Sequence, residues 1–477
     1  MSYISLNYYI LVILALIVYY ILPIKRRWVV LLITNIAFYF VFYKTGWWIF
    51  LATILVSYLC GLLVSKESNL KKKIWLWAGI ILTAVPWLMV KNGNYVLSGL
   101  LKRDSINFII PLGISFYSLQ IIAYLVDVYY GKIEAEENVA KYVLFVSFFP
   151  QLIQGPIPRY AQLQNQLIEG HRFDEETFTK GFCYIIWGFF LKLVIADKAG
   201  IVVNLVFDNY PAYSGIYIWL ASVLYSLQIY ADFLACTTLA QGVSKLFGIE
   251  IINNFERPYL AVSIQDFWRR WHISLSSWLK DYIYIPIGGN RKGKTRKTLN
   301  LLITFLVSGV WHGAGFKFIF WGMMHACYEI AGSMTYKVRE KIYSFFHVTE
   351  NSKKLLKQTG TFLLVNWAWI IFRADSLGRG LRLIKHMFTE INPWILFNDR
   401  IFSLGLNWKE FVVLVIAIFI LWRVDRYHES GRSVTGWIIK QRLPVRWIIY
   451  IASIIVTMVV GTYGYGFNAQ DFIYGGF

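Results

Sequence analysis

The sequence predicts an all-α protein that crosses a membrane many times, and three observations carry this prediction. Hydrophobic residues make up 57% of the 477 residues and charged residues only 16%, against about 25% in a typical soluble domain. The mean hydropathy is +0.51. Apolar runs of about 20 residues, enough to span a bilayer as a helix, recur along the chain. One integral-membrane domain over residues 1–477 is the simplest organisation, because no long polar block could fold separately.

The distribution of charges and cysteines also indicates a membrane protein. The net charge is +20, and Lys and Arg collect between the apolar runs, as they do in cytoplasmic loops and at helix ends. This distribution argues against nucleic-acid binding. The four cysteines lie in or beside apolar runs without CxxC spacing, so neither a disulfide framework nor a metal site is indicated. The first apolar run lacks the flanks of a cleavable signal peptide and is expected to remain as a helix.

Residues 6–22 form the first predicted span, which is ended by Pro23 and the basic cluster 25–27. The positive-inside rule places that cluster in the cytoplasm and the N-terminus outside. Further spans are predicted at 28–43, 47–64 and 74–90, with the lysine-rich residues 66–73 in the cytoplasm.

The next part of the chain is less regular. A span at 106–129 should be kinked or broken near Pro111 and Gly113. Residues 143–157 are predicted as a re-entrant or interfacial piece, because non-helical backbone at membrane depth needs surrounding protein or a water cavity. The polar residues 161–179 are expected in the cytoplasm, and 181–195 are apolar but contain Lys192. Residues 216–233, which end near Asp232, and 235–247 are predicted as two separate helices.

Beyond the central stretch, spans are predicted at 316–332, 361–372, 411–422 and 447–461. The expected total is about eleven spans plus re-entrant and interfacial pieces. No internal repeat is visible, which argues against a transporter built on inverted repeats.

Residues 263–278 are predicted as one amphipathic helix at the membrane surface. Its apolar residues recur at steps of four and three, at Ile264, Trp268, Trp271, Leu275 and Trp278. Ser263 and Asp266 resemble a capping box at its start. His272 would lie about 40° around the helix from Trp268 and face the bundle. An interfacial helix with an incidental histidine explains this pattern equally well.

His312 follows the almost entirely apolar residues 299–311. An ionisable group at membrane depth is costly and marks a functional site by default, and imidazole is suited to removing a proton from a hydroxyl. Gly309, Gly313 and Gly315 would leave room for a ligand, or would allow close helix packing. His325 does not share a helical face with His312, and no carboxylate or cysteine completes a metal site.

Several motifs between about residues 106 and 377 are similar, in the same order, to those of one known family. They are PLGISFYSLQ at Pro111, FPQLIQGPIPR at Phe149, LFGIEIINNFERPYL at Leu246, DFWRRWHISLSSWLKDYIYIPIGGNRKG at Asp266, SGVWHG at Ser308 and IIFRADS at Ile370. The chain resembles the membrane-bound O-acyltransferase (MBOAT) family, in the bacterial branch of the alginate O-acetylation membrane subunit and peptidoglycan O-acetyltransferases. The IPIGGNRKG and FRADS pieces favour this branch over the teichoic-acid branch.

The resemblance implies a ring of helices whose funnels, one from each face, meet at a thin centre near a catalytic histidine. That histidine corresponds to His312, and the family's second, polar position corresponds to His272, which is expected to be catalytic too. With Arg269 or Arg270, His272 would orient the acyl donor or meet its phosphates. Where relatives read FDFSGYTD, residues 231–239 read ADFLACTTL, which keeps Asp232. The residues expected to contact substrate are Arg269, Arg270, Asp232, Trp311 and Gly313. Anchoring to lipid headgroups is an equal alternative for the two arginines.

The function implied is transfer of a short acyl group, acetyl in the first instance, to a hydroxyl of an extracytoplasmic polysaccharide. The donor would be a cytoplasmic thioester such as acetyl-CoA, and His312 would be the base or the acyl carrier, with no bound cofactor or metal. The resemblance also implies the bacterial cytoplasmic membrane and a separate extracytoplasmic partner of the SGNH-hydrolase type. D-alanyl transfer to teichoic acid and a non-enzymatic transporter are the alternatives.

Overall fold

The computed structural model describes residues 3–43, 45–102, 104, 106, 108–313, 315–389, 391–464 and 472. These residues form helices and connecting turns with no strand among them, which confirms the all-α class. The chain divides into two compact units. One contains Met1–Gly188 and Cys236–Asn253, and the other contains Phe189–Ala235 and Asn254–Gln470.

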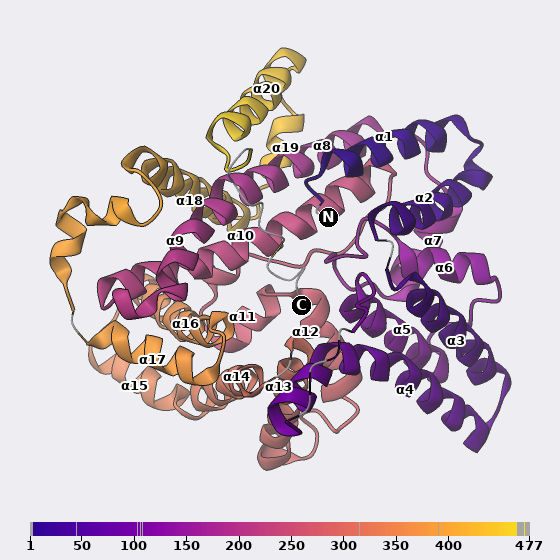
Figure 1. Ribbon diagram of the computed structural model, residues 1–477, viewed down its shortest axis with the longest axis horizontal. Helices are drawn as coiled ribbons and strands as arrows, with labels where there is room; N and C mark the ends of the chain where they lie inside the picture. The colour runs from indigo at the N-terminus through magenta and orange to yellow at the C-terminus, as the bar shows by residue number, and fades with distance from the viewer. Residues whose placement is uncertain are drawn as a thin grey trace. The chain divides into compact units, whose positions relative to one another are not determined.

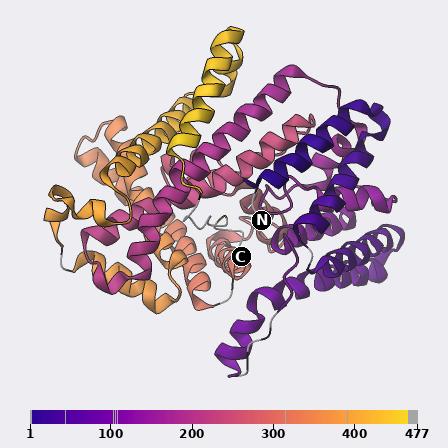
Figure 2. The ribbon, with the colours of Figure 1, turned by 45° about the horizontal axis from the view of Figure 1, so that its top comes forward.

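The first unit holds helices α1 to α8 (Figure 1). In the purple part of Figures 1 and 2, α3, α4 and α5 lie side by side, and α2 packs on both α1 and α6. The bounds are α1 Leu6–Ile21, α2 Arg27–Phe42, α3 Trp47–Lys66, α4 Asn69–Asn94, α5 Ile114–Tyr129, α6 Val139–Ser147, α7 Tyr160–Glu169 and α8 Glu175–Phe190, whose last two residues belong to the other unit.

The helices predicted in this unit are largely confirmed. The first four agree with α1–α4 to within a few residues. The break predicted in residues 106–129 is also confirmed, because α5 begins only at Ile114. Gly113 precedes it with φ +71°, and a Cβ there would overlap the carbonyl oxygen of Leu152. Glycine is therefore required at this position.

Residues 143–157, predicted as a re-entrant or interfacial piece, begin inside α6, and only the part after Ser147 is non-helical and buried. Phe148, Phe149 and Gln154 are each fully enclosed. Neighbouring side chains satisfy its backbone, since the Phe149 N–H donates to Asn35 Oδ1 at 3.0 Å and the Ile153 N–H donates to the Tyr3 hydroxyl at 3.2 Å. Irregular backbone is therefore surrounded by protein here, and its depth in a membrane stays a prediction.

The second unit holds the helices that follow α8. The hairpin of α13 and α14 packs on α16, and α11 packs on both α14 and α16. The bounds are α9 Asp197–Asp208, α10 Ile216–Leu246, α11 Ile264–Arg270, α12 Ile273–Leu279, α13 Gly293–His312, α14 Phe316–Met334, α15 Tyr336–Phe345, α16 Glu350–Arg373, α17 Leu377–Phe388, α18 Trp408–Glu429, α19 Val434–Ile439 and α20 Leu443–Val460, together with the π-helical turns η3 Leu191–Ala196 and η6 Lys280–Tyr284.

The two helices predicted at 216–233 and 235–247 are wrong as separate elements, because α10 runs without interruption through both. Asp232, taken as the end of the first, lies inside the helix and is only 2% exposed. Its carboxylate is paired with the Lys192 ammonium at 2.8 Å. With its charge met by a cation from η3, the aspartate does not need to reach solvent and α10 continues.

The single amphipathic helix predicted at 263–278 is also wrong. The chain breaks between α11 and α12, and His272 adopts a left-handed conformation with φ 45° and ψ 54°. Asn254 causes the break: its carbonyl accepts from the Ile273 N–H at 2.9 Å, and its Oδ1 accepts from the Ser274 N–H at 3.1 Å. A continuous helix would have used these donors internally. The cap at Ser263 is confirmed, since its hydroxyl accepts from the Asp266 N–H.

Within the described residues, four helices are long and apolar enough to cross a membrane: Trp47–Lys66, Asn69–Leu97, Ile216–Leu246 and Leu443–Val460. Leu6–Ile21 and Ile114–Tyr129 are shorter apolar helices. A multi-pass protein is consistent with this set, whereas the count of about eleven spans is not confirmed.

Glycines allow α13 and α14 to pack closely beside His312. A Cβ at Gly309 would overlap the carbonyl oxygen of Phe318, and one at Gly322 would overlap that of Phe305. Because backbone atoms fill the space, neither position has room for a side chain.

Gly309→Ala should therefore destabilise the folded protein by about 1–3 kcal/mol through overpacking. The loss would be measured as a lower thermal midpoint of the detergent-solubilised protein. Gly332→Ala on the same helix pair is the matched control, because a Cβ there meets nothing within 4 Å. Equal midpoints for the two variants would contradict this packing.

Candidate functional site

His312 is the last residue of α13. The apolar residues before it form the helix, and Gly313, at φ 153°, ends it. Gly315, at φ 102°, starts the turn into α14. The imidazole is only 3% exposed. The two glycines thus place His312 at the end of a mainly apolar helix.

Aromatic rings from three helices enclose His312. The ring centroids of Trp311 on α13 and Trp321 on α14 each lie 4.8 Å from the imidazole, and that of Phe372 on α16 lies 5.2 Å away. All three meet it nearly perpendicularly, at 77–85°. This shell removes water from the imidazole, which strengthens any electrostatic interaction made there.

His272 lies on the other side of Trp311. Their ring centroids are 5.8 Å apart, and the Phe233 ring lies 4.8 Å from His272. Its Nδ1 is 3.2 Å from Asn254 Oδ1, an acceptor, so Nδ1 carries the proton and donates. Trp311 therefore connects the two histidines proposed from sequence.

His272 is neutral in the folded protein. It lies at the break between α11 and α12, outside the predicted spans, and burial lowers its pKa to about 3. At neutral pH it can orient a neighbour by a hydrogen bond, but it carries no charge with which to attract a phosphate.

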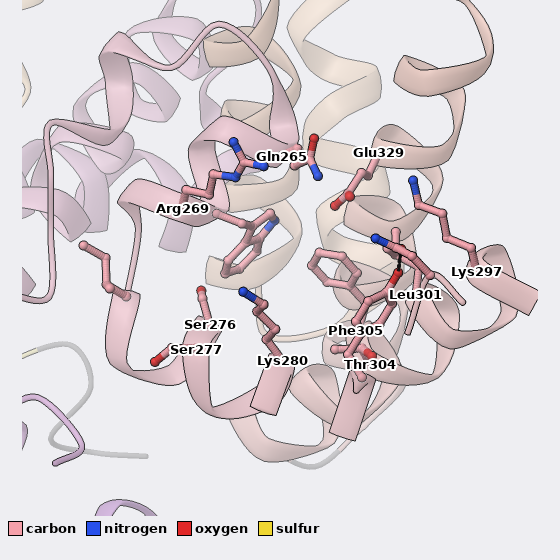
Figure 3. A pocket seen from close by; sticks show the side chains of 14 residues that line it. Gln265, Arg269, Ser276, Ser277, Lys280, Lys297, Leu301, Thr304, Phe305 and Glu329 are labelled. Carbon is pink, nitrogen blue, oxygen red and sulfur yellow. Dashed lines mark hydrogen bonds between the residues drawn. The ribbon is translucent and has the colours of Figure 1, made fainter. Parts of the chain in front are cut away.

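A cleft of about 490 Å³ opens in the same unit (Figure 3). Trp268 and Phe305 form an aromatic wall, and Ser276 and Ser277 contribute hydroxyls. Its charged lining residues are Arg269, Lys280, Lys297 and Glu329, and Figure 3 shows Arg269, Lys280 and Glu329 facing the same space. The cationic lining suits an anionic ligand.

One indole separates this cleft from His312. Trp268 in the cleft wall lies 5.8 Å from Trp321, whose other contacts include His312 at 4.8 Å. The Trp268 Nε1–H donates to His325 Nδ1 at 3.3 Å. His325 thus fixes the orientation of the cleft wall.

The structure separates the two arginines that the sequence grouped together. Arg269 lines the cleft. Arg270 donates instead to Asp266 Oδ1 at 3.0 Å and to Glu429 Oε2 at 2.9 Å, which ties α11 to the end of α18. Only Arg269 therefore faces space that a substrate could fill.

Asp232 does not line the cleft. Lys192 lies between two carboxylates, 2.8 Å from Asp232 and 2.9 Å from Asp197, and the three side chains are 1–3% exposed. The next residue on α10, Phe233, contacts His272. Asp232 is thus the sequence neighbour of a residue that contacts His272, but its own carboxylate is held in a buried ion pair with Lys192.

Sequence reasoning missed Trp321 and Phe372 around His312, and Ser276, Lys280 and Glu329 in the cleft. A signal existed for part of the cleft. Residues 273, 276, 277 and 280, and again 297, 301, 304 and 305, recur at helical spacing and line it.

Comparison with known proteins relates this chain to acyltransferases. A model of the MBOAT, membrane-bound O-acyltransferase family, matches residues 136–353, which contain both histidines and the cleft. A probable alginate O-acetylase AlgI of Pseudomonas syringae is 32% identical over 432 residues, covering 87% of this chain and 81% of that protein. A peptidoglycan O-acetyltransferase of Helicobacter pylori is 34% identical, covering 71% and 69%. A teichoic acid D-alanyltransferase of Bacillus subtilis is 31% identical, covering 47% and 60%.

Proposed function

Because this chain belongs to the membrane-bound O-acyltransferase family, we propose that it moves an acetyl group from a cytoplasmic thioester to a hydroxyl of a cell-surface polysaccharide. It is an O-acyltransferase. The relatives named as alginate O-acetylase and peptidoglycan O-acetyltransferase support a polysaccharide acceptor and acetyl as the acyl group.

The observation that carries the proposal is the burial of His312 in an aromatic shell one indole away from a cationic cleft. His312 takes the proton of the acceptor hydroxyl as the oxygen attacks the thioester carbonyl. It then returns that proton to the departing sulfur, so that ester and thiol are the products. As acyl carrier, its nitrogen would attack the carbonyl first and pass the acyl group to the hydroxyl.

The donor is a thioester such as acetyl-CoA, acting as co-substrate without a bound cofactor. Its phosphates would meet Arg269, Lys280 and Lys297 in the cleft. His272, neutral and hydrogen-bonded to Asn254, would hold Trp311 against His312. Gly313 would allow the Phe318 ring to pack against the backbone beside the imidazole, because a Cβ there would lie 2.8 Å from that ring.

The protein lies in the bacterial cytoplasmic membrane, with about eleven spans in a ring whose funnels meet near His312. A separate extracytoplasmic protein of the SGNH-hydrolase type receives the acyl group and completes transfer to the polysaccharide.

The test is to release base-labile acyl groups from envelopes of host strains with and without this protein and to identify them by mass. Acetate that depends on the protein would support the proposal. D-alanine would move the protein to teichoic-acid modification, which the D-alanyltransferase relative favours. Unchanged ester content would overturn the acyl-transfer proposal and favour a transporter.

Arg269→Gln should raise KM for acetyl-CoA by about fivefold to tenfold, because one charge-assisted hydrogen bond to phosphate is lost. The turnover number should stay near its original value, since the arginine does not touch the reacting atoms. Release of free CoA by membrane vesicles measures both constants.

Arg270→Gln is the matched control on the same helix, and it should lower the thermal midpoint instead, because Glu429 loses one of its cations. An unchanged KM in Arg269→Gln would remove Arg269 from the donor site.

A further inference from the structure

Acyl transfer develops negative charge on the thioester oxygen, and that oxygen needs a hydrogen-bond donor in a dry site. Neither proposed histidine fills this role: His312 exchanges the proton, and the Nδ1–H of His272 is committed to Asn254. The two histidines therefore do not supply the donor that the oxyanion needs.

Trp321 offers one. Its side chain is 0% exposed, and its Nε1–H has no hydrogen-bond acceptor within the part of the chain that the structure describes. A buried donor left without a protein acceptor is costly and rare in native proteins. At a reaction centre, such a donor is available to a substrate.

The position of Trp321 fits this role. Its ring contacts the cleft wall at Trp268 and contacts His312 on α13. A thioester carbonyl placed against the imidazole from the side of Trp268 would therefore lie beside this indole. The ring is also held in place, because it stacks on Trp369 at an interplanar angle of 21° and contacts Phe372 at 5.2 Å.

Other buried indoles do not share this position. Trp87, Trp367 and Trp369 also have an Nε1–H without an acceptor among the described residues. Trp369 stacks on Trp321, but its described ring contacts do not include His312. Trp87 belongs to the first unit, and the ring contact recorded for Trp367 is with Phe388. Only Trp321 combines an available donor with direct contact to His312 in the described ring contacts.

We propose that the Nε1–H of Trp321 donates a hydrogen bond to the thioester carbonyl oxygen and stabilises the oxyanion as the C–O bond forms. The π electrons of the carbonyl move onto that oxygen during attack and return when the C–S bond breaks. The sulfur leaves with the electron pair and takes the proton held by His312. Trp321 keeps its own proton throughout. This assignment rests on the acyltransferase function proposed above.

The test is Trp321→Phe, which removes the N–H and keeps an aromatic ring. The turnover number for CoA release from acetyl-CoA should fall by about 10²–10³-fold, with KM nearly unchanged. The thermal midpoint should fall as well, because the smaller ring leaves a cavity at this buried position. Trp367→Phe on α16 is the matched control and should keep the wild-type turnover number. A turnover number within threefold of wild type in Trp321→Phe would overturn the assignment.

A second replacement guards against misfolding. Benzothienylalanine at position 321 keeps the shape of the indole but has sulfur in place of the N–H. The same loss of turnover in this well-folded protein supports the hydrogen bond, whereas full activity shows that Trp321 serves only packing. Failure of the proposed function would look different, because the wild-type protein itself would then release no CoA.

Discussion

His312→Ala should give a folded protein whose acyl transfer is about 10²–10⁴-fold slower than that of the wild type, the usual contribution of a positioned base. Trp311, Trp321 and Phe372 contact the imidazole and carry no base, so none of these three side chains can take over proton transfer. Truncation leaves those rings in place, so the thermal midpoint should change little compared with the rate.

The measurement is envelope acetate at matched membrane levels of the two proteins, together with CoA release from vesicles. Added imidazole should restore part of the lost activity, because the alanine leaves a ring-sized space. His347→Asn, at an exposed histidine with φ 51°, is the control for a general effect of losing an imidazole. If His312→Ala retained wild-type ester content, His312 could not be the base or the acyl carrier.

The second large effect is on stability. Lys192→Met should destabilise the protein by about 3–5 kcal/mol, the cost of leaving a buried charge without its partner. Lys192 is 2.8 Å from Asp232 and 2.9 Å from Asp197, and all three side chains are almost completely enclosed. Thermal midpoints in detergent would measure the loss. The same change at Lys180, whose pair with Glu176 is solvent-exposed, should cost less than about 1 kcal/mol.

A triple variant separates charge from shape at this site. Lys192→Met combined with Asp197→Asn and Asp232→Asn removes every charge while nearly keeping the volumes, and it should recover much of the stability. Recovery with normal turnover would assign the triad to structure alone. Recovery without turnover would instead support a role for Asp232 at the reaction centre. A single Lys192→Met variant as stable as the wild type would show that the carboxylates do not need this cation.

The helix that carries His312 was predictable, and the position of His272 was not. An ionisable residue after thirteen mostly apolar ones, 299–311, is conspicuous in any sequence. The break at His272 depends on Asn254, 18 residues earlier, whose side chain accepts from the α12 backbone. The continuity of α10 depends on Lys192, 40 residues before Asp232. Helical periodicity describes neighbours along a helix, and it cannot show a partner supplied from elsewhere in the fold.

The cleft could be predicted from the sequence only in part. The helical spacing of its lining residues is readable on α12 and on α13 separately, but which stripes face each other is decided by the packing of the helices. The role of the Trp321 indole could not be predicted from the sequence for the same reason. An aromatic residue in an apolar run is ordinary, and only contact with His312 distinguishes it.

The division of the chain has a consequence for biogenesis. The first unit also contains residues 236–253 and Phe472, and synthesis reaches both after the second unit has begun at Phe189. When synthesis has just reached Gly188, the end of α10, which belongs to the first unit, has therefore not yet been made. The insertion machinery must keep the early helices from aggregating or being degraded until that segment emerges. Fragments cut at residue 188 should not accumulate, and gene fusions that exchange the N-terminal half between relatives should carry residues 236–253 with it.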